Sequence, residues 1–126
     1  MPRKNLEFGV WAETQAVNFL KVRGYKILKR NYKTKFSEID IVALDANVIC
    51  FVEVKARHSD VFGQPAEAVS WHKQRQISRS AICYLKENNA LQRPARFDIL
   101  TLLYDEKLPE INLIKDAFCL ASNFTV

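Results

Sequence analysis

The sequence predicts an α/β domain in which helices cover a mixed β-sheet, with elements in the order α-β-β-β-α-β-β. Apolar residues recur at helical spacing over residues 6–23 and in a second long segment that ends near Asn88. Two β-rich runs flank a turn-like triplet at 45–47, which is typical of a hairpin. A dense apolar run, 96–104, suits a strand that is buried on both faces. The length predicts one domain, residues 1–126, with its own core.

The first helix, residues 6–23, should end at Gly24, because glycine is common just past a helix C-terminus. Glu13 falls among its apolar positions and shares a stripe with Val17 and Leu20. An exposed glutamate accounts for this position, and so does a carboxylate that reaches a metal centre. The helix alone leaves both interpretations open.

A basic segment follows this helix. Seven of the fifteen residues from 21 to 35 are Lys or Arg, and none is acidic. Lysines that protect an edge strand explain this composition. A flank that contacts phosphates explains it equally, with Tyr25 and Tyr32 available for base stacking. Under that second, compatible interpretation, the residues expected to contact nucleic acid are Lys29, Arg30 and Lys33.

The hairpin carries charges where a buried strand rarely does. Side chains alternate between the faces of a strand, so Glu53 and Lys55 should point the same way, with Asp40 near them on the neighbouring strand. Two carboxylates suit a hard cation such as Mg²⁺ or Mn²⁺, and a lysine beside it could orient a water. A partly buried Glu–Lys pair beside an Asp near a turn explains the same residues without a metal.

The second helix should begin near Pro65 and Glu67, since both residue types suit a first helical turn. Lys73 lies on its inward stripe near the helix start. It either snorkels to solvent or meets the carboxylates or a substrate phosphate. Arg75 and Arg79, four residues apart, form a basic row on another face.

The end of the chain predicts a short strand at 110–114 and then a turn of helix at 116–121. Cys50, Cys83 and Cys119 lie far apart in apolar contexts, without metal or redox spacing, and are interpreted as small buried hydrophobes.

Composition narrows the class of protein. The chain is 48% hydrophobic and 26% charged, as in an ordinary globular protein, and its net charge of +5 favours polyanionic partners. No signal-like segment and no apolar run long enough to span a bilayer is recognised, so we expect a cytoplasmic protein that does not bind membranes.

An Asp, a hairpin and then Glu-x-Lys resemble the PD-(D/E)xK nuclease superfamily. The whole chain is similar to the YraN family, described as Holliday junction resolvase-like. One departure is Ser37, where that family usually has Gly before Glu-Ile-Asp, which should alter the backbone rather than the chemistry. The matching pieces are Gly9 with Ala12-Glu13, Gly24-Tyr25 with Ile27-Leu28, Asn31, Glu38-Ile39-Asp40, Phe51 to Lys55 with Arg57, Phe62-Gly63, Lys73, Arg96-Phe97-Asp98 and Ala117-Phe118.

The resemblance implies a restriction-endonuclease-like fold and a metal-dependent endonuclease that cleaves phosphodiester bonds. Asp40 and Glu53 would hold Mg²⁺ or Mn²⁺, with Glu13 assisting. Lys55 would position the attacking water. The residues expected to contact phosphate are Arg57 and Lys73.

The expected substrate is nucleic acid, with DNA favoured. The sequence has no guanidinium pattern that reads bases, so recognition should be structure-selective, with branched DNA as one candidate. An enzyme that cuts junctions needs two active sites, which would make it a symmetric homodimer. Two alternatives stay open: a nucleic-acid-binding protein on a nuclease fold that does not cleave by itself, and a structural or adaptor protein in which the charged trio is a buried salt-bridge network.

Overall fold

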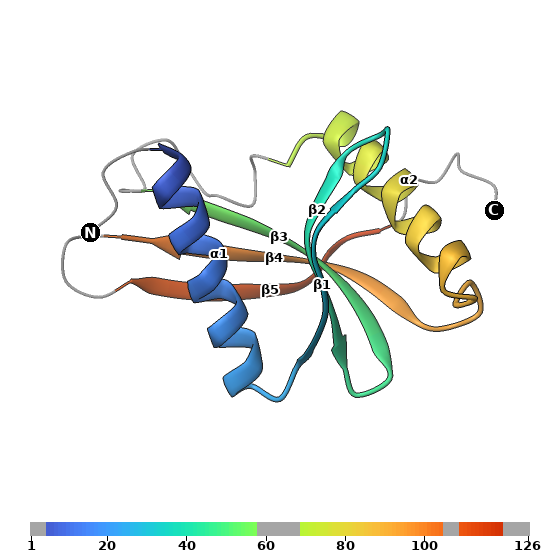
Figure 1. The fold of residues 1–126 in the computed structure, drawn as a ribbon, viewed down its shortest axis with the longest axis horizontal. Helices are drawn as coiled ribbons and strands as arrows, with labels where there is room; N and C mark the ends of the chain where they lie inside the picture. The colour runs from blue at the N-terminus through green and yellow to red at the C-terminus, as the bar shows by residue number, and fades with distance from the viewer. Residues whose placement is uncertain (1–4, 58–68, 105–108, 120–126) are drawn as a thin grey trace.

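The computed structural model describes residues 5–57, 69–104 and 109–119. Within these ranges, the elements follow the predicted order α-β-β-β-α-β-β (Figure 1). The helices are α1 (Asn5–Val22) and α2 (Trp71–Glu87), and the strands are β1 (Lys26–Lys33), β2 (Glu38–Asp45), β3 (Val48–Arg57), β4 (Ala95–Leu103) and β5 (Glu110–Phe118).

The five strands form one mixed sheet in the order β1-β2-β3-β4-β5. The first three are antiparallel neighbours, β3 and β4 are parallel, and β5 returns antiparallel to β4. The parallel pair needs a crossover, which α2 supplies between β3 and β4. This mixed sheet with a helix on each face is consistent with a restriction-endonuclease-like fold, and it confirms the predicted fold class.

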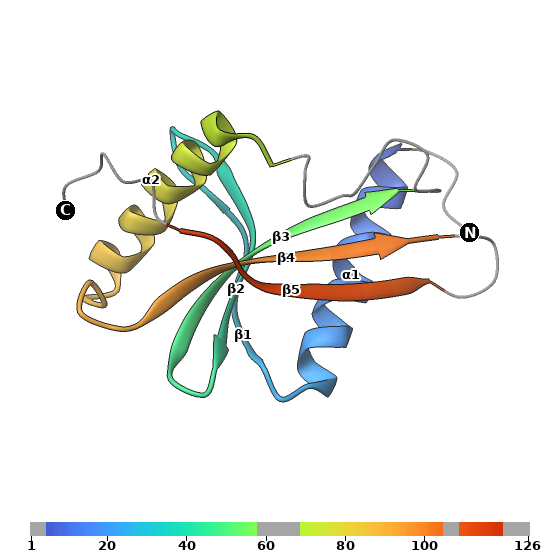
Figure 2. The ribbon, with the colours of Figure 1, turned by 180° about the vertical axis from the view of Figure 1, so that it is seen from behind.

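The two helices cover opposite faces of the sheet. In Figure 1, α1 passes in front of β3, β4 and β5, and Figure 2 shows the same strands in front of α1. Each helix packs on the sheet through its own cluster of buried apolar side chains, called the α1 cluster and the α2 cluster. Phe51 belongs to the α2 cluster and its neighbour Val52 to the α1 cluster, because successive side chains of β3 point to opposite faces of the sheet. The α1 cluster joins Ala16, Val17 and Leu20 to Ile41, Val52 and Leu100, and the α2 cluster joins Ile77 and Ala81 to Ile39, Phe51 and Ile99.

The end of α1 confirms the predicted glycine stop. Gly24 has φ +89°, a conformation that costs glycine little. The N–H of Gly24 donates to the carbonyl of Lys21, and the N–H of Tyr25 donates to the carbonyl of Leu20, both at 3.0 Å. These bonds satisfy carbonyls that the helix end would otherwise leave without partners, and they turn the chain into β1.

The second helix begins later than the sequence suggested. Ser70 is its N-cap, and the Ser70 hydroxyl accepts the N–H of Lys73 at 3.1 Å. Pro65 and Glu67, which were expected in the first turn, lie outside the described residues. The helix ends at Glu87, close to the predicted end near Asn88.

The prediction for β5 is wrong beyond residue 114. The strand continues to Phe118, and Asp116 is a strand residue with φ 55° where a helical turn was expected. Pairing with β4 explains this: Phe97 lies opposite Phe118, their rings stack with centroids 4.8 Å apart, and the register shifts between Phe97 and Ile99. A bulge at this point lets an aromatic pair extend the strand.

One smaller expectation is wrong. Of the three cysteines, only Cys50 is buried; Cys83 is half-buried and Cys119 is exposed, so the interpretation of all three as buried hydrophobes is wrong. Ser37 does not have a positive φ, and its hydroxyl donates to the carbonyl of Gln76 in α2 at 3.1 Å. None of the described helices is long and apolar enough to cross a membrane.

Candidate functional site

The β2–β3 hairpin places the candidate site. Its strands pair from Asp45 opposite Val48 to Ile41 opposite Val52, and Ala46 turns the chain with φ 55°. The next contact is different in kind, because it uses a side chain: Oδ2 of Asp40 accepts the backbone N–H of Val54 at 2.8 Å. The carboxylate thus takes over as hydrogen-bond acceptor where the paired register ends.

This contact holds Asp40 beside Glu53, so the structure brings the two predicted carboxylates together. The two carboxyl groups act on each other's titration, so they lie close together. Burial raises the pKa of Asp40, and burial followed by the charge of Asp40 raises the pKa of Glu53 to about 8. The Glu53 carboxyl group therefore keeps a proton over much of the neutral pH range.

Glu53 is the more confined of the two. It is 3% exposed, and its Oε1 atom has no hydrogen-bond partner among the described residues. Leaving a buried polar atom without a partner is costly, so such an atom calls for an explanation such as a catalytic role or an ion.

Two lysines act on the pair from different elements. Lys55 follows Glu53 by two residues on β3, and Lys73 lies in the first turn of α2. The charge of Lys73 lowers the pKa of both carboxyl groups, against the larger effect of burial, and Lys55 lowers that of Glu53. Neither lysine forms an ion pair within 4.0 Å with either carboxylate among the residues described. Both ammonium groups are thus near the pair without being bonded to it.

Glu13 approaches from the α1 side. It lines a cavity of about 310 Å³ together with Asp40, Val54 and residues of α1. Burial, then the charge of Asp40, raises the pKa of Glu13. Across the described ranges, however, no group of three or more His, Cys, Asp or Glu side chains is close enough together to hold a metal ion. Glu13 faces Asp40, and its role as a third ligand stays a prediction.

Asn31 is a site residue for which reasoning from the residues gave no role. It has φ 53° in the middle of β1, a left-handed conformation that asparagine tolerates better than most residues. Its side chain forms a hydrogen bond with Glu13, which opposes the rise in the pKa of Glu13. An asparagine within a run of strand-forming residues is the one signal that could have indicated it.

Three of the predicted phosphate contacts, Lys29, Arg30 and Lys33, lie on β1. Arg30 and Lys33 line a second cavity, of about 450 Å³, together with Asn31, Glu13 and Glu38. Lys29 is exposed on the same edge strand and is not among the lining residues. The predicted edge position of this basic segment is confirmed, and half-buried Arg57 ends β3, on the strand that carries Glu53 and Lys55.

The expectation that two tyrosines stack on bases is wrong. Tyr25 and Tyr32 are 6% and 8% exposed. The Tyr25 hydroxyl accepts from Nη2 of Arg96 at 2.8 Å, and the Tyr32 hydroxyl donates to Glu87 at 2.9 Å. Burying a large ring while its hydroxyl finds a partner is favourable, so both tyrosines belong to the packed interior.

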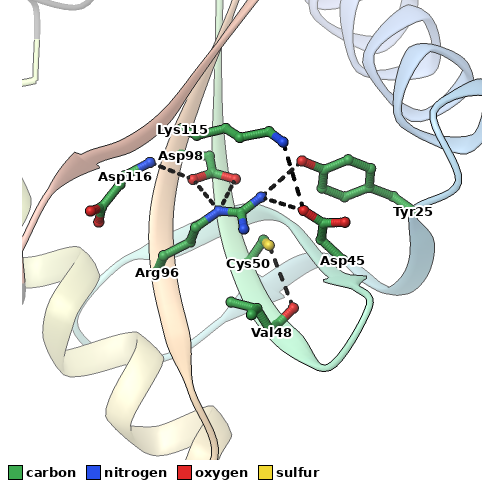
Figure 3. Close-up of polar contacts among 8 residues, drawn as sticks. All are labelled: Tyr25, Asp45, Val48, Cys50, Arg96, Asp98, Lys115 and Asp116. Carbon is green, nitrogen blue, oxygen red and sulfur yellow. Dashed lines mark hydrogen bonds and ion pairs between the residues drawn. The ribbon is translucent and has the colours of Figure 1, made fainter.

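A buried ion-pair network exists, at a different place from the charged trio (Figure 3). Nε of Arg96 donates to both carboxylate oxygens of Asp98, at 3.0 and 3.1 Å, and Nη2 of Arg96 contacts Asp45 at 2.9 Å. Asp98 is fully buried and also accepts the N–H of Asp116 at 2.8 Å. Lys115 lies 3.8 Å from Asp45. This network ties β2, β4 and β5 together.

Comparison with known proteins gives a consistent result. Residues 12–102 match the family described as "Uncharacterised protein family UPF0102". A UPF0102 protein of Geotalea uraniireducens is 46% identical over 118 residues, which cover 93% of each chain. Another, from Geobacter metallireducens, is 43% identical over 121 residues, 96% of this chain and 99% of the relative. One from Clostridium kluyveri is 37% identical over 116 residues, 90% and 95% of the two chains.

Proposed function

The chain belongs to the UPF0102 family, which is the YraN family of the sequence resemblance above, and on that premise we propose that it is a metal-dependent endonuclease. The proposed reaction is hydrolysis of phosphodiester bonds in a nucleic acid, DNA being favoured, with selection by substrate structure. Family membership supports a nuclease-like protein, and the contacts of Asp40 and Glu53 support the chemistry.

The observation that carries the proposal is the pair of buried carboxyl groups. Burial and the charge of Asp40 raise the pKa of Glu53 to about 8, and Oε1 of Glu53 has no partner among the described residues. Hard divalent cations prefer oxygen ligands, and replacing the proton of Glu53 by a cation would satisfy this oxygen. Asp40 and Glu53 therefore fit Mg²⁺ or Mn²⁺. Glu13, on the α1 side, would have to move closer to them to act as a further ligand. When bound, such a cation would polarise the phosphate and lower the pKa of a water.

The remaining residues would orient the attacking water and neutralise the charge of the substrate phosphates. Lys55 lies close enough to Glu53 to lower its pKa, so its amine can hold a water at the pair. Lys73 acts on both carboxyl groups and is placed to neutralise a substrate phosphate. Arg30 and Lys33 line the cavity that opens beside Glu13 and would guide the backbone of the substrate. Arg57 is proposed as a further phosphate contact.

The main alternative is a protein that binds nucleic acid on the same fold without cleaving it. The salt-bridge alternative has less support, because Lys55 and Lys73 form no ion pair within 4.0 Å with the pair in the described part of the chain, whereas Arg96 and Asp98 do form a buried pair.

The test is a cleavage assay with branched, duplex and single-stranded substrates, each with Mg²⁺, Mn²⁺ or EDTA. We expect cleavage that requires the metal and differs among substrates of identical base composition. Asp40→Asn is the inactive control. Binding without metal-dependent cleavage on every substrate would favour the binding-protein alternative.

A further inference from the structure

A surface of alternating aromatic and basic side chains runs along α2. Trp71, Arg75 and Arg79 are spaced four residues apart, so they lie in one row on the helix. Phe36 and Lys35, from the connection between β1 and β2, continue the row beyond Arg79. These five residues are called the Trp71 surface below.

The side chains of the Trp71 surface are stacked in a regular manner. The guanidinium of Arg75 lies 5.0 Å from the Trp71 ring centroid. The guanidinium of Arg79 and the amine of Lys35 each lie 5.3 Å from the Phe36 centroid. Trp71 is 59% exposed with Arg75 in this position, so much of the indole stays open to solvent. The exposed part of the indole is therefore available for stacking against another ring.

Buried hydroxyl groups hold the two halves of the surface together. Oγ of Ser80 in α2 lies 2.7 Å from the hydroxyl oxygens of both Thr34 and Ser37. Ser37 also donates to the carbonyl of Gln76. These hydrogen bonds attach the β1–β2 connection to α2, with Phe36 beside Arg79.

Both ends of the Trp71 surface are joined along the chain to residues of the candidate site. Trp71 and Lys73 share the first turn of α2, and Lys73 acts electrostatically on both Asp40 and Glu53. At the other end of the row, the β1–β2 connection leads directly into β2, which carries Asp40. A nucleic-acid strand that is bound at the candidate site can therefore extend onto the Trp71 surface.

The chemistry of the row fits a single-stranded nucleic acid. Unpaired bases present faces that stack on tryptophan, and arginines between the aromatic rings can neutralise the backbone. In a duplex the bases stack on one another, so their faces are not available to an exposed indole. We propose that the Trp71 surface binds an unpaired strand and thereby selects substrates that carry a single-stranded segment beside the cleavage point. This inference rests on the proposed function, whose substrate it narrows.

The test uses the intrinsic fluorescence of Trp71. Trp11 packs against Phe8 and Tyr104, with ring centroids 5.6 and 5.3 Å away, so Trp11→Phe keeps a ring there and leaves Trp71 as the single tryptophan. This variant is titrated in EDTA with a thymidine oligonucleotide, an oligouridine and a blunt duplex. We expect the two single strands to quench the fluorescence by stacking, and the duplex to leave it unchanged. Quenching by the duplex alone, or by none of the three, would overturn the proposal.

Affinity is then compared between wild type and substitutions. Trp71→Ala should weaken single-strand binding by about 5- to 150-fold and leave duplex binding unchanged. The matched control is Leu91→Ala, which removes an exposed apolar side chain outside the row and should change neither. Arg75→Gln with Arg79→Gln should flatten the salt dependence by about 1.4 in log–log slope. Equal loss on single strand and duplex would refute selection by this surface.

The two proposals fail separately. These titrations need no metal and no cleavage, so a positive result stands even if no metal ever produces cleavage. Conversely, metal-dependent cleavage that Trp71→Ala leaves unchanged on substrates with single-stranded segments would refute the role of the surface and retain the nuclease.

Discussion

Oδ2 of Asp40 accepts the backbone N–H of Val54 at 2.8 Å, at the point where the pairing of β2 and β3 ends. One carboxylate thereby does two things: it satisfies a strand N–H, and it stands beside Glu53. The first role needs only an oxygen, whereas binding a cation needs a carboxyl group. The two roles can therefore be separated by a substitution that keeps the oxygen.

Asp40→Asn should abolish metal-dependent cleavage and leave the fold as stable as wild type or slightly more stable, within about 1 kcal/mol. The asparagine oxygen can still accept from Val54, and the repulsion within the buried pair disappears. Thermal melts with and without Mn²⁺ measure this. Metal should raise the wild-type midpoint by linkage and raise that of Asp40→Asn much less.

Lys55→Ala is the companion variant, because lysine supplies no metal ligand. It should lose cleavage yet retain a metal-dependent rise in midpoint. If the trio were a structural salt-bridge network, both variants would lose about 3–5 kcal/mol and metal would move neither midpoint. That outcome would remove the catalytic assignment.

The raised pKa of Glu53 predicts how the free energy of unfolding changes with pH. Burial and the charge of Asp40 raise the pKa of Glu53 from 4.5 to about 8. Between these values the folded protein keeps a proton that the unfolded chain has released. The contribution is therefore fully present below about pH 4.5 and is lost as the pH rises through about 8.

Urea unfolding in EDTA from pH 5 to pH 9 checks this. Over that range, the free energy of unfolding of wild type should fall by at least about 1.4 kcal/mol more than that of Glu53→Gln, which cannot ionise. Mn²⁺ affinity should rise across the same range, since the cation replaces the proton. Parallel stability profiles for the two proteins would contradict the raised pKa of Glu53.

Local patterns were enough to predict that Asp40 lies beside Glu53. The turn at 45–47 sets the register of the hairpin as far as Ile41 opposite Val52, and the next residues along the two strands are Asp40 and Glu53. The same patterns could not predict the fate of Tyr25, because its hydroxyl partner, Arg96, lies 71 residues away. An exposed and a buried tyrosine look alike in a strand of lysines until the neighbouring elements are placed.

Long-range contacts also explain the other differences. β5 extends to Phe118 because Phe97 stacks on it, which no local signal near 116 indicates. The left-handed Asn31 is likewise stabilised by a partner on another element, Glu13. Ser80 is a further residue whose contact was not predicted. It is fully buried beside Ala81 on the inward face of α2, and a buried hydroxyl group requires a polar partner.

Asn31 offers a matched pair of variants. Asn31→Ala loses the hydrogen bond to Glu13 and places alanine at φ 53°, which should destabilise the fold by about 1 kcal/mol. Asn31→Gly loses the same bond and tolerates this φ, so it should be less destabilised. Both should lower the cleavage rate about 2- to 10-fold. Both should also shift the pH–rate profile upward, since the bond lowers the pKa of Glu13.

The activity of Asn31→Gly shows whether Asn31 acts through its backbone conformation or through its contact with Glu13. If Asn31→Gly retains full activity while Asn31→Ala is impaired, Asn31 matters for the backbone alone, and its contact with Glu13 has no part in the reaction.

The basic edge strand predicts a salt effect. Replacing Lys29, Arg30 and Lys33 by Ala should weaken nucleic-acid binding for all sequences, because phosphate contacts release counterions. The log–log slope of affinity against salt for a duplex should fall by up to about 2.7. Lys86→Ala, an exposed lysine near the end of α2, is the control and should leave the slope nearly unchanged. An unchanged slope in the triple variant would leave β1 as a protected edge only.

The network around Arg96 predicts a contrast with the candidate site, since here the charges are paired. Arg96→Met should cost about 3–5 kcal/mol, because it leaves the fully buried carboxylate of Asp98 without its cation. Asp98→Asn should cost less, since Arg96 keeps Asp45 and the new side chain can still accept the N–H of Asp116. The double variant should be more stable than Arg96→Met alone, because no buried charge is left unpaired. Urea unfolding of the four proteins gives the coupling energy, and Mn²⁺ should stabilise all four equally. A double variant no more stable than Arg96→Met, or a loss of the Mn²⁺ effect, would show that this network is not the purely structural counterpart of the Asp40–Glu53 pair.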